Sequence, residues 1–165
     1  MRILGIDPGT RVVGFGLVQC RKSQSINPRD YSILDAGVVK ADVKLSQASR
    51  LGAIHQEIFK LAEHWQPQLC VIEGAFFGRN ARSALMLGQA RGALIAAMAR
   101  VNVPVEEIAP TKVKMVMTGR GQSEKLEVAK AVERLLRFQL GLLPFDVSDA
   151  LAIALSFCLS RVERT

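Results

Sequence analysis

The chain has 165 residues, of which 49% are hydrophobic and 22% are charged. This length suits a single domain spanning residues 1–165 with a substantial core, and the hydrophobic content argues against intrinsic disorder. The net charge of +7 favours a polyanionic partner, most often a nucleic acid.

The first part of the chain predicts three antiparallel strands. Residues 3–6 form a continuous apolar run before a Pro-Gly turn, as expected of a buried central strand. A second β-rich run over residues 12–18 follows after a very short connection, so the two strands should form an antiparallel hairpin. Residues 31–39 are the third strand candidate.

The rest of the chain predicts alternating helices and strands. The expected elements are a helix over 46–65, a strand over 69–72 ending at Glu73, a helix over 83–99, a strand over 103–108, a helix from an N-cap at Ser123 to Arg137, and a helix over 148–162. This order predicts an α/β fold with a mixed five-stranded sheet, antiparallel at first and then extended by parallel crossovers, flanked by helices.

Small residues form a stripe on the helix expected over residues 83–99. Ala84, Gly88, Gly92 and Ala96 recur at a spacing of four residues and therefore share one face. Glycine weakens a helix, so two glycines on one face indicate that another backbone approaches closely. On the pattern alone, the partner is expected to be the sheet rather than another subunit.

The chain has three cysteines, Cys20, Cys70 and Cys158, which are widely spaced. They predict neither a disulfide framework nor a zinc site, and they suit the reducing cytoplasm. The chain has no apolar run of 18 residues, and its short apolar start is interrupted by Asp7. We therefore expect no membrane-spanning helix, no signal peptide and no membrane partner.

The basic excess is concentrated in one part of the chain. Residues 79–137 contain eleven basic and five acidic residues, a net charge of +6, whereas the remainder carries only +1. We expect this segment to supply most of a DNA-facing surface.

Four carboxylates occupy unusual positions. Asp7 and Glu73 each end an apolar strand, and the ends of adjacent parallel strands lie side by side where α/β sheets bind ligands. Asp146 and Asp149 are three residues apart at the start of the last helix and share a face. Each has an ordinary explanation when taken alone: a turn for Asp7, an ion pair with arginine for Glu73, and helix capping for the other two.

Taken together, the four carboxylates could form one oxygen-rich site. They would repel one another strongly without a cation, and oxygen ligands suit Mg²⁺ or Mn²⁺. An acidic metal site with basic surroundings is typical of phosphodiester cleavage, in which two ions can activate a water and stabilise the leaving oxygen. Lys125 could reach a phosphate from a helix start, and either Phe76 or Phe77 could stack on a base.

Several motifs resemble the RuvC family of bacterial Holliday junction resolvases. They are ILGIDPGTR at 3–11, VIE at 71–73 followed by Phe76, SALMLGQARG at 83–92, and DVSDALAIAL at 146–155. The resemblance runs in order from Met1 to about Leu159. Each motif is moderately specific, and their shared order and spacing make the match strong.

The resemblance implies a ribonuclease H-like fold, a homodimer, and Mg²⁺-dependent symmetric nicking of four-way DNA junctions that leaves 5′-phosphate and 3′-hydroxyl ends. It also implies that the protein acts together with the RuvA and RuvB branch-migration proteins, and that the helix with the small-residue stripe forms the dimer interface. We expect two Mg²⁺ per subunit, with Mn²⁺ as a substitute. The implied residues are Asp7, Glu73, Asp146 and Asp149 as catalytic metal ligands, Lys125 as a catalytic and phosphate-binding residue, and Lys114, Phe76 and Arg79 as DNA-binding residues.

The match has two mild departures. Thr10 stands where the family often has serine, and Gly74 stands where glutamine is common, which adds backbone freedom just before Phe76. Two other functions remain open. An ATPase of the actin, Hsp70 or sugar-kinase kind opens with a similar strand but needs two domains, and a non-catalytic junction-binding protein would not need all four acids.

Overall fold

The computed structural model describes residues 1–21, 27–74, 80–141 and 143–162. In chain order, its elements are β1 (Arg2–Asp7), β2 (Val12–Cys20), a short 3₁₀ helix (Pro28–Asp30), β3 (Tyr31–Lys40), α1 (Gln47–Trp65), β4 (Leu69–Glu73), α2 (Ala81–Arg100), β5 (Val105–Ile108), α3 (Pro110–Thr118), α4 (Lys125–Leu136) and α5 (Phe145–Val162). No described helix is both long and apolar enough to cross a membrane.

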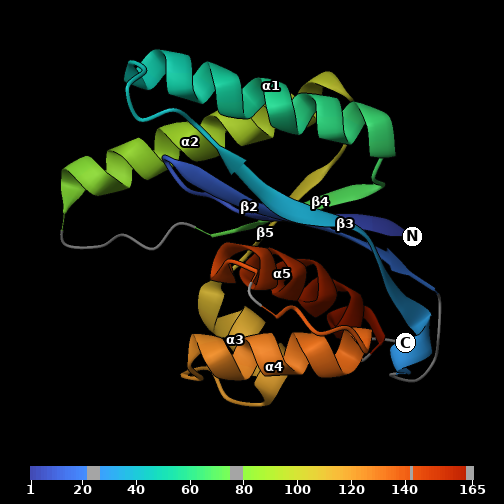
Figure 1. Ribbon diagram of the computed structural model, residues 1–165. Coiled ribbons are helices and arrows are strands. Elements are labelled where there is room, and N and C mark those ends of the chain that lie inside the picture. The colour runs from blue at the N-terminus through green and yellow to red at the C-terminus, as the bar shows by residue number, and fades with distance from the viewer. Residues whose placement is uncertain (22–26, 75–79, 142, 163–165) are drawn as a thin grey trace.

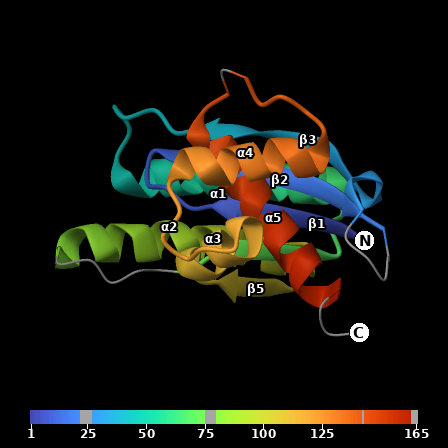
Figure 2. The same cartoon turned by 90° about the horizontal axis from the view of Figure 1, so that it is seen from below.

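The strands form one mixed sheet in the order β3-β2-β1-β4-β5, as the sequence predicts. β1, β2 and β3 pair antiparallel, whereas β4 pairs parallel to β1 and β5 pairs parallel to β4. Helices cover both faces of this sheet, with α1 and α2 on one face and α3, α4 and α5 on the other (Figures 1 and 2). β1 therefore lies in the middle of the molecule.

Successive side chains of β1 point to opposite faces of the sheet, so they pack alternately against the α1–α2 layer and the α3–α5 layer. Leu4 and Ile6 are fully buried in the core on the α1 and α2 side, whereas Ile3 belongs to the core beneath α5. Gly5 faces the same side as Ile3, since side chains alternate along a strand, and Asp7 follows at the next position on that side. The strand thus ends with a carboxylate on the face that α5 covers.

Glycines in β1 and β2 allow α5 to lie very close to the sheet. A Cβ atom on Gly5 would lie 2.1 Å from the main-chain oxygen of Ala150, and one on Gly14 would lie 2.1 Å from that of Asp146. A Cβ atom on Gly16 would lie 2.7 Å from the side chain of Leu151. Any larger residue at these positions would force α5 away from the strands, so the three glycines set the height of α5 above the sheet.

The helices differ from expectation at three places. α3 was not expected. Its nine residues begin at Pro110 and bury only Val113, so the sequence shows no repeating apolar face there. Ser123 is not the N-cap of α4; it is buried, and its hydroxyl lies 2.7 Å from that of Thr118. Glu124 takes that position instead. α5 begins at Phe145 rather than at residue 148, which places Asp146 inside the first turn.

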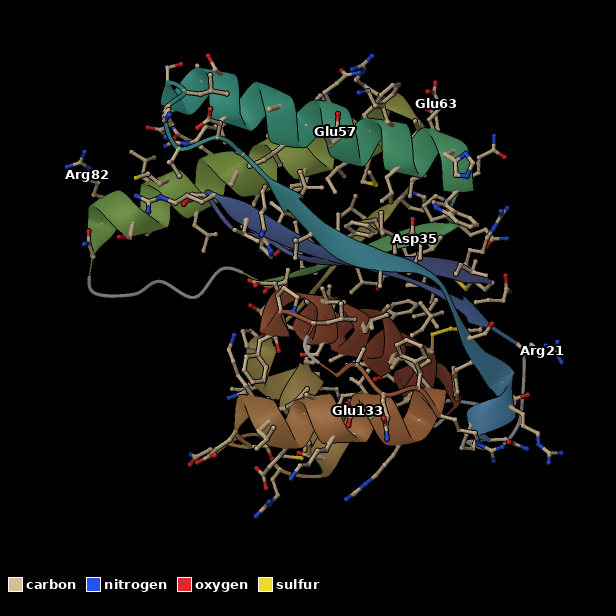
Figure 3. The ribbon with its side chains drawn as sticks, in the orientation of Figure 1. Arg21, Asp35, Glu57, Glu63, Arg82 and Glu133 are labelled. Atoms are coloured by element: carbon tan, nitrogen blue, oxygen red, sulfur yellow. A yellow bond between two sulfur atoms is a disulfide. The ribbon has the colours of Figure 1, made fainter. Side chains whose placement is uncertain are left out.

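The expectation that the chain has no disulfide is wrong, because Cys20 and Cys158 are bonded. Cys20 ends β2, and α5 crosses β2 and brings Cys158 above it, with 6.6 Å between the two Cα atoms. The bond links the sheet to the C-terminal half of α5 (Figure 3). A separation of 138 residues hides this pairing from any local pattern. Cys70 is free and buried.

The small-residue stripe of α2 does not face the sheet, so that expectation is also wrong. A Cβ atom on Gly88 or Gly92 would meet nothing within 4 Å. Both residues are exposed, as is Ala96, and Leu85 on the same helix is 65% exposed. The buried face of α2 consists of other residues, and the first part of the helix extends beyond the sheet, where Arg82 lies at its far end (Figures 1 and 3).

Candidate active site

Two of the four carboxylates lie at the same edge of the sheet. Asp7 is the last residue of β1 and Glu73 is the last residue of β4, and these strands are parallel neighbours whose register pairs Ile6 with Ile72. The next residue on each strand is therefore the carboxylate. The two acids stand side by side where the strands end, as expected from the sequence.

The other two carboxylates reach this edge because α5 begins directly above it. Gly14 pairs with Asp7 in the antiparallel register, and the main chain of Asp146 lies against Gly14. Asp149 is one turn further along α5. Close contact at Gly14 thus places the first turns of α5 over the end of β1.

The electrostatics of Asp7 show that the four acids share one environment. Burial, followed by the charges of Glu73, Asp149 and Asp146, raises the pKa of Asp7 from its usual 3.8 to about 7, against the opposing charge of Lys125. Burial and Asp149 also raise the pKa of Glu73. This edge of the sheet therefore carries more negative charge than its own cations neutralise.

Two lysines from the neighbouring helices face this cluster. Lys125 is the first residue of α4, and its Nζ lies 2.7 Å from Oδ2 of Asp149. This hydrogen bond raises the pKa of Lys125, whose side chain is still 64% exposed. Lys114 in α3 acts on Glu73 through its charge and lowers the pKa of that residue. The basic residues expected to bind phosphate therefore border the acids.

The donor atoms suit a hard divalent cation, although the side chains are not arranged around one. In the described part of the chain, no group of three or more His, Cys, Asp or Glu side chains could hold a metal ion as it stands. Carboxylate oxygens are the ligands that Mg²⁺ and Mn²⁺ prefer, and a cation would relieve the excess charge seen at Asp7. Burial raises the pKa of the Cys70 thiol to about 12, so it offers no competing thiolate.

Phe76 and Arg79 lie outside the described residues, as does Phe77.

Sequence reasoning missed one residue beside the acids. Arg91 counts among the basic residues of the segment expected to face DNA, yet it is only 7% exposed. Its guanidinium donates to the main-chain oxygen of Glu73 and pairs with Glu107. The signal was present in the spacing, because Arg91, Leu94 and Met98 share the buried face of α2.

Comparison with known proteins places this chain in a family of nucleases. The family model described as "Crossover junction endodeoxyribonuclease RuvC" matches residues 3–157. Crossover junction endodeoxyribonuclease RuvC of Thermosipho melanesiensis is 36% identical over 164 residues, which are 99% of both chains. The Chlorobium chlorochromatii protein of the same name is 39% identical over 155 residues, 94% of this chain and 78% of the other.

A solved structure agrees with the sequence comparison. Thermus thermophilus RuvC in complex with Holliday junction substrate superposes with a TM-score of 0.89 at 31% identity, over 100% of this chain and 97% of the other. The fold is ribonuclease H-like, with a mixed five-stranded sheet flanked by helices. The chain belongs to the RuvC family of crossover junction endodeoxyribonucleases. The expected family is thus confirmed, and the ATPase alternative is not supported.

Proposed function

We propose that this protein is an endonuclease that resolves Holliday junctions during DNA recombination and repair, by nicking two strands of a four-way junction symmetrically. The proposal rests above all on one observation: Asp7 at the end of β1 is surrounded by three further carboxylates from β4 and α5, and burial together with their charges raises its pKa to about 7. Membership of a family of crossover junction endodeoxyribonucleases supports it. The expected products carry 5′-phosphate and 3′-hydroxyl ends.

Cleavage is proposed to depend on Mg²⁺, two ions per subunit, with Mn²⁺ as a substitute. Asp7, Glu73, Asp146 and Asp149 would hold the ions, because their oxygens form the cluster with excess negative charge. Bound there, the ions would supply an activated water and stabilise the leaving oxygen.

The remaining roles belong to the basic and aromatic residues. Lys125 and Lys114 would contact phosphate oxygens of the DNA, and Lys125 would also stabilise the charge that develops on the cleaved phosphate. The exposed side chain of Lys125 supports this role, since it stands beside Asp149 and still faces solvent. Phe76 is proposed to stack on a base and Arg79 to bind the DNA backbone.

A homodimer is proposed to deliver the two symmetric nicks, because two cuts related by a two-fold axis need two sites related in the same way. The exposed face of α2 is the candidate interface. Gly88 and Gly92 leave open space above the helix, and Leu85 and Ile95 are exposed beside them. RuvA and RuvB are the proposed further partners, and residues 1–165 are proposed to form one domain. The cytoplasm is the proposed location because the proposed substrate is cellular DNA; the cysteines no longer support it, since the Cys20–Cys158 bond is unusual for a reducing compartment.

The decisive experiment is cleavage of a synthetic four-way junction with one labelled strand in each assay. The protein with Mg²⁺ should give paired nicks at symmetric positions on a denaturing gel, and EDTA should abolish them. Asp7→Asn should bind the junction without cutting it, since the variant loses a charged ligand.

Asp35→Asn is the matched control. Asp35 lies on β3 and accepts a hydrogen bond from the Trp65 indole at the end of α1. It is therefore on the side of the sheet away from α5 (Figure 3). This variant should cut normally. Full cutting by Asp7→Asn would overturn the proposal, and junction binding by the wild-type protein without nicks in any divalent ion would favour a non-catalytic binding protein.

A further inference from the structure

Arg91 is a buried arginine on the inner face of α2. Its side chain is 8% exposed, and its helical neighbours on that face, Leu94 and Met98, are fully buried. Arginine is almost never buried without partners, because its charge cannot be neutralised by losing a proton. The contacts that Arg91 makes therefore have to account for its position.

The guanidinium joins α2 to the ends of two strands. One nitrogen donates to the main-chain oxygen of Glu73, the last residue of β4. A second nitrogen lies 2.7 Å from Oε1 of Glu107 on β5, and Glu107 pairs with Ile72 in the parallel register. Arg91 thus spans β4 and β5 at the edge of the sheet where the acids lie.

This contact fixes the main chain next to a carboxylate of the site. The amide of Gly74 donates to the oxygen of Ile108, at 2.7 Å, and is the last described bond between this end of β4 and β5. Arg91 holds the preceding carbonyl from the opposite direction, through α2. A guanidinium, whose N–H donors lie in one rigid plane, is well suited to such a task because two of its nitrogens can bind different partners at once.

The same burial argues against contact with DNA. Arg82 and Arg100 on the same helix are exposed, whereas the donors of Arg91 are directed at Glu73 and Glu107. A phosphate cannot reach Arg91 without displacing these partners.

We propose that Arg91 is a positioning residue that anchors the end of β4, so that the Glu73 carboxylate keeps its place beside Asp7. The inference rests on the proposed role of Glu73 as a metal ligand. Residues that orient metal ligands from behind are known to affect metal affinity by about 10- to 100-fold. Loss of Arg91 should therefore weaken metal binding without weakening DNA binding.

The test measures Mn²⁺ binding to the DNA-free protein from the decrease of the free-ion EPR signal. Arg91→Met keeps a long side chain but removes the charge and the N–H donors, and it should raise the Mn²⁺ dissociation constant by about 10-fold or more. Arg91→Lys can donate to the Glu73 carbonyl but cannot span both partners, so its Mn²⁺ affinity should be intermediate. Both variants should bind a four-way junction in EDTA as the wild-type protein does.

Arg100→Met is the matched control. Arg100 is on the same helix and also makes contacts, 4.0 Å above the Phe59 ring and 3.2 Å from Nε2 of His55, but none with the acids. This variant should retain the Mn²⁺ affinity of the wild-type protein, even if it is less stable. Circular dichroism melting curves separate loss of fold from loss of metal binding.

The outcomes separate the inference from the proposed function. Unchanged Mn²⁺ affinity in folded Arg91→Met, or weaker junction binding with unchanged Mn²⁺ affinity, overturns the positioning role. If Arg91→Met does not fold, Arg91→Lys decides, and a wild-type Mn²⁺ affinity in that variant overturns it. Glu73→Gln tests the premise, because unchanged Mn²⁺ affinity there would contradict the ligand role of Glu73 itself.

Discussion

At the scale of single residues, the carboxyl group of Asp7 is held in an unfavourable environment. Its folded-state pKa is about 7 against a usual value of 3.8, chiefly because it is buried and then because other acids surround it. The folded protein therefore binds a proton at Asp7 between about pH 4 and pH 7, where the unfolded chain has already released it. Stability from this group is present below pH 4 and is lost as the pH rises to 7.

The first prediction is that Asp7→Asn stabilises the metal-free protein at pH 8. Asparagine resembles the protonated acid in shape but has no charge to desolvate, so the gain should be on the order of 3 kcal/mol, or roughly 5–10 °C in melting temperature. At pH 5 the difference should be smaller, because part of the penalty is already present there, and it should disappear only below about pH 4, where Asp7 is protonated in both the folded and the unfolded chain. Melting curves in EDTA at both pH values measure this, and an equal difference at both would refute the assignment.

A second prediction concerns metal binding and pH. A proton and a cation compete for the Asp7 carboxylate, so the Mn²⁺ affinity of the DNA-free protein should rise by up to tenfold per pH unit below pH 7 and level off above it. Titration of Mn²⁺ between pH 5.5 and 8.5 measures the slope. A flat profile across this range would show that Asp7 is ionised throughout.

The four acids could be singled out from the sequence because of their positions. Two are charged residues at the ends of apolar strands, and two lie at the start of the last helix. Sequence reasoning could not find the raised pKa of Asp7, which depends on four side chains from three elements. It also counted Arg91 as surface charge, because a sum of charges does not record which face of a helix a residue occupies.

At the scale of elements, the strands and the long helices were predictable because their apolar periodicity is strong. α3 was not, since it is short and buries one residue among those described. The height of α5 above the sheet was also not predictable. Gly14 and Gly5 look like ordinary strand residues until the facing helix is known, and only then do they show why Asp146 can approach Asp7.

The third prediction follows from that close approach. In Gly14→Ala the new Cβ would lie 2.1 Å from the Asp146 oxygen, a main-chain atom that cannot turn aside. The variant should lose about 2 kcal/mol of stability and most of its cutting activity, because α5 must move away. Gly52→Ala is the control: Gly52 lies in α1 with nothing within 4 Å, so alanine should stabilise by about 0.5–1 kcal/mol. Chemical denaturation and junction cleavage compare the two, and equal effects would contradict this role of Gly14.

At the scale of the whole molecule, the exposed face of α2 and the net charge of +7 point to larger assemblies. The composition predicts an anionic partner but not where it binds, since at least one basic residue of the +6 segment is buried in the protein. The small-residue stripe predicts close packing, and only the three-dimensional arrangement shows that the sheet is not its partner.

The fourth prediction tests that second copy. Leu85→Glu places a charge on the proposed interface and should cost about 2 kcal/mol, a roughly 30-fold weaker association. Sedimentation should show the wild-type protein at twice 18.0 kDa and the variant shifted toward the single-chain mass. Val43→Glu, which replaces a residue that is 59% exposed ahead of α1, should remain dimeric. A wild-type protein with single-chain mass would contradict the dimer.

The bond between Cys20 and Cys158 also closes most of the polypeptide into a covalent ring. Any single peptide-bond cleavage between these two positions would leave two pieces that still migrate together until a reductant separates them. The ring contains Glu73, Asp146 and Asp149, whereas Asp7 lies on the short arm before it. Because Cys20 itself belongs to the ring, a molecule cut once within it would keep all four acids on connected chain, and it could rebuild the site without finding a lost fragment in solution.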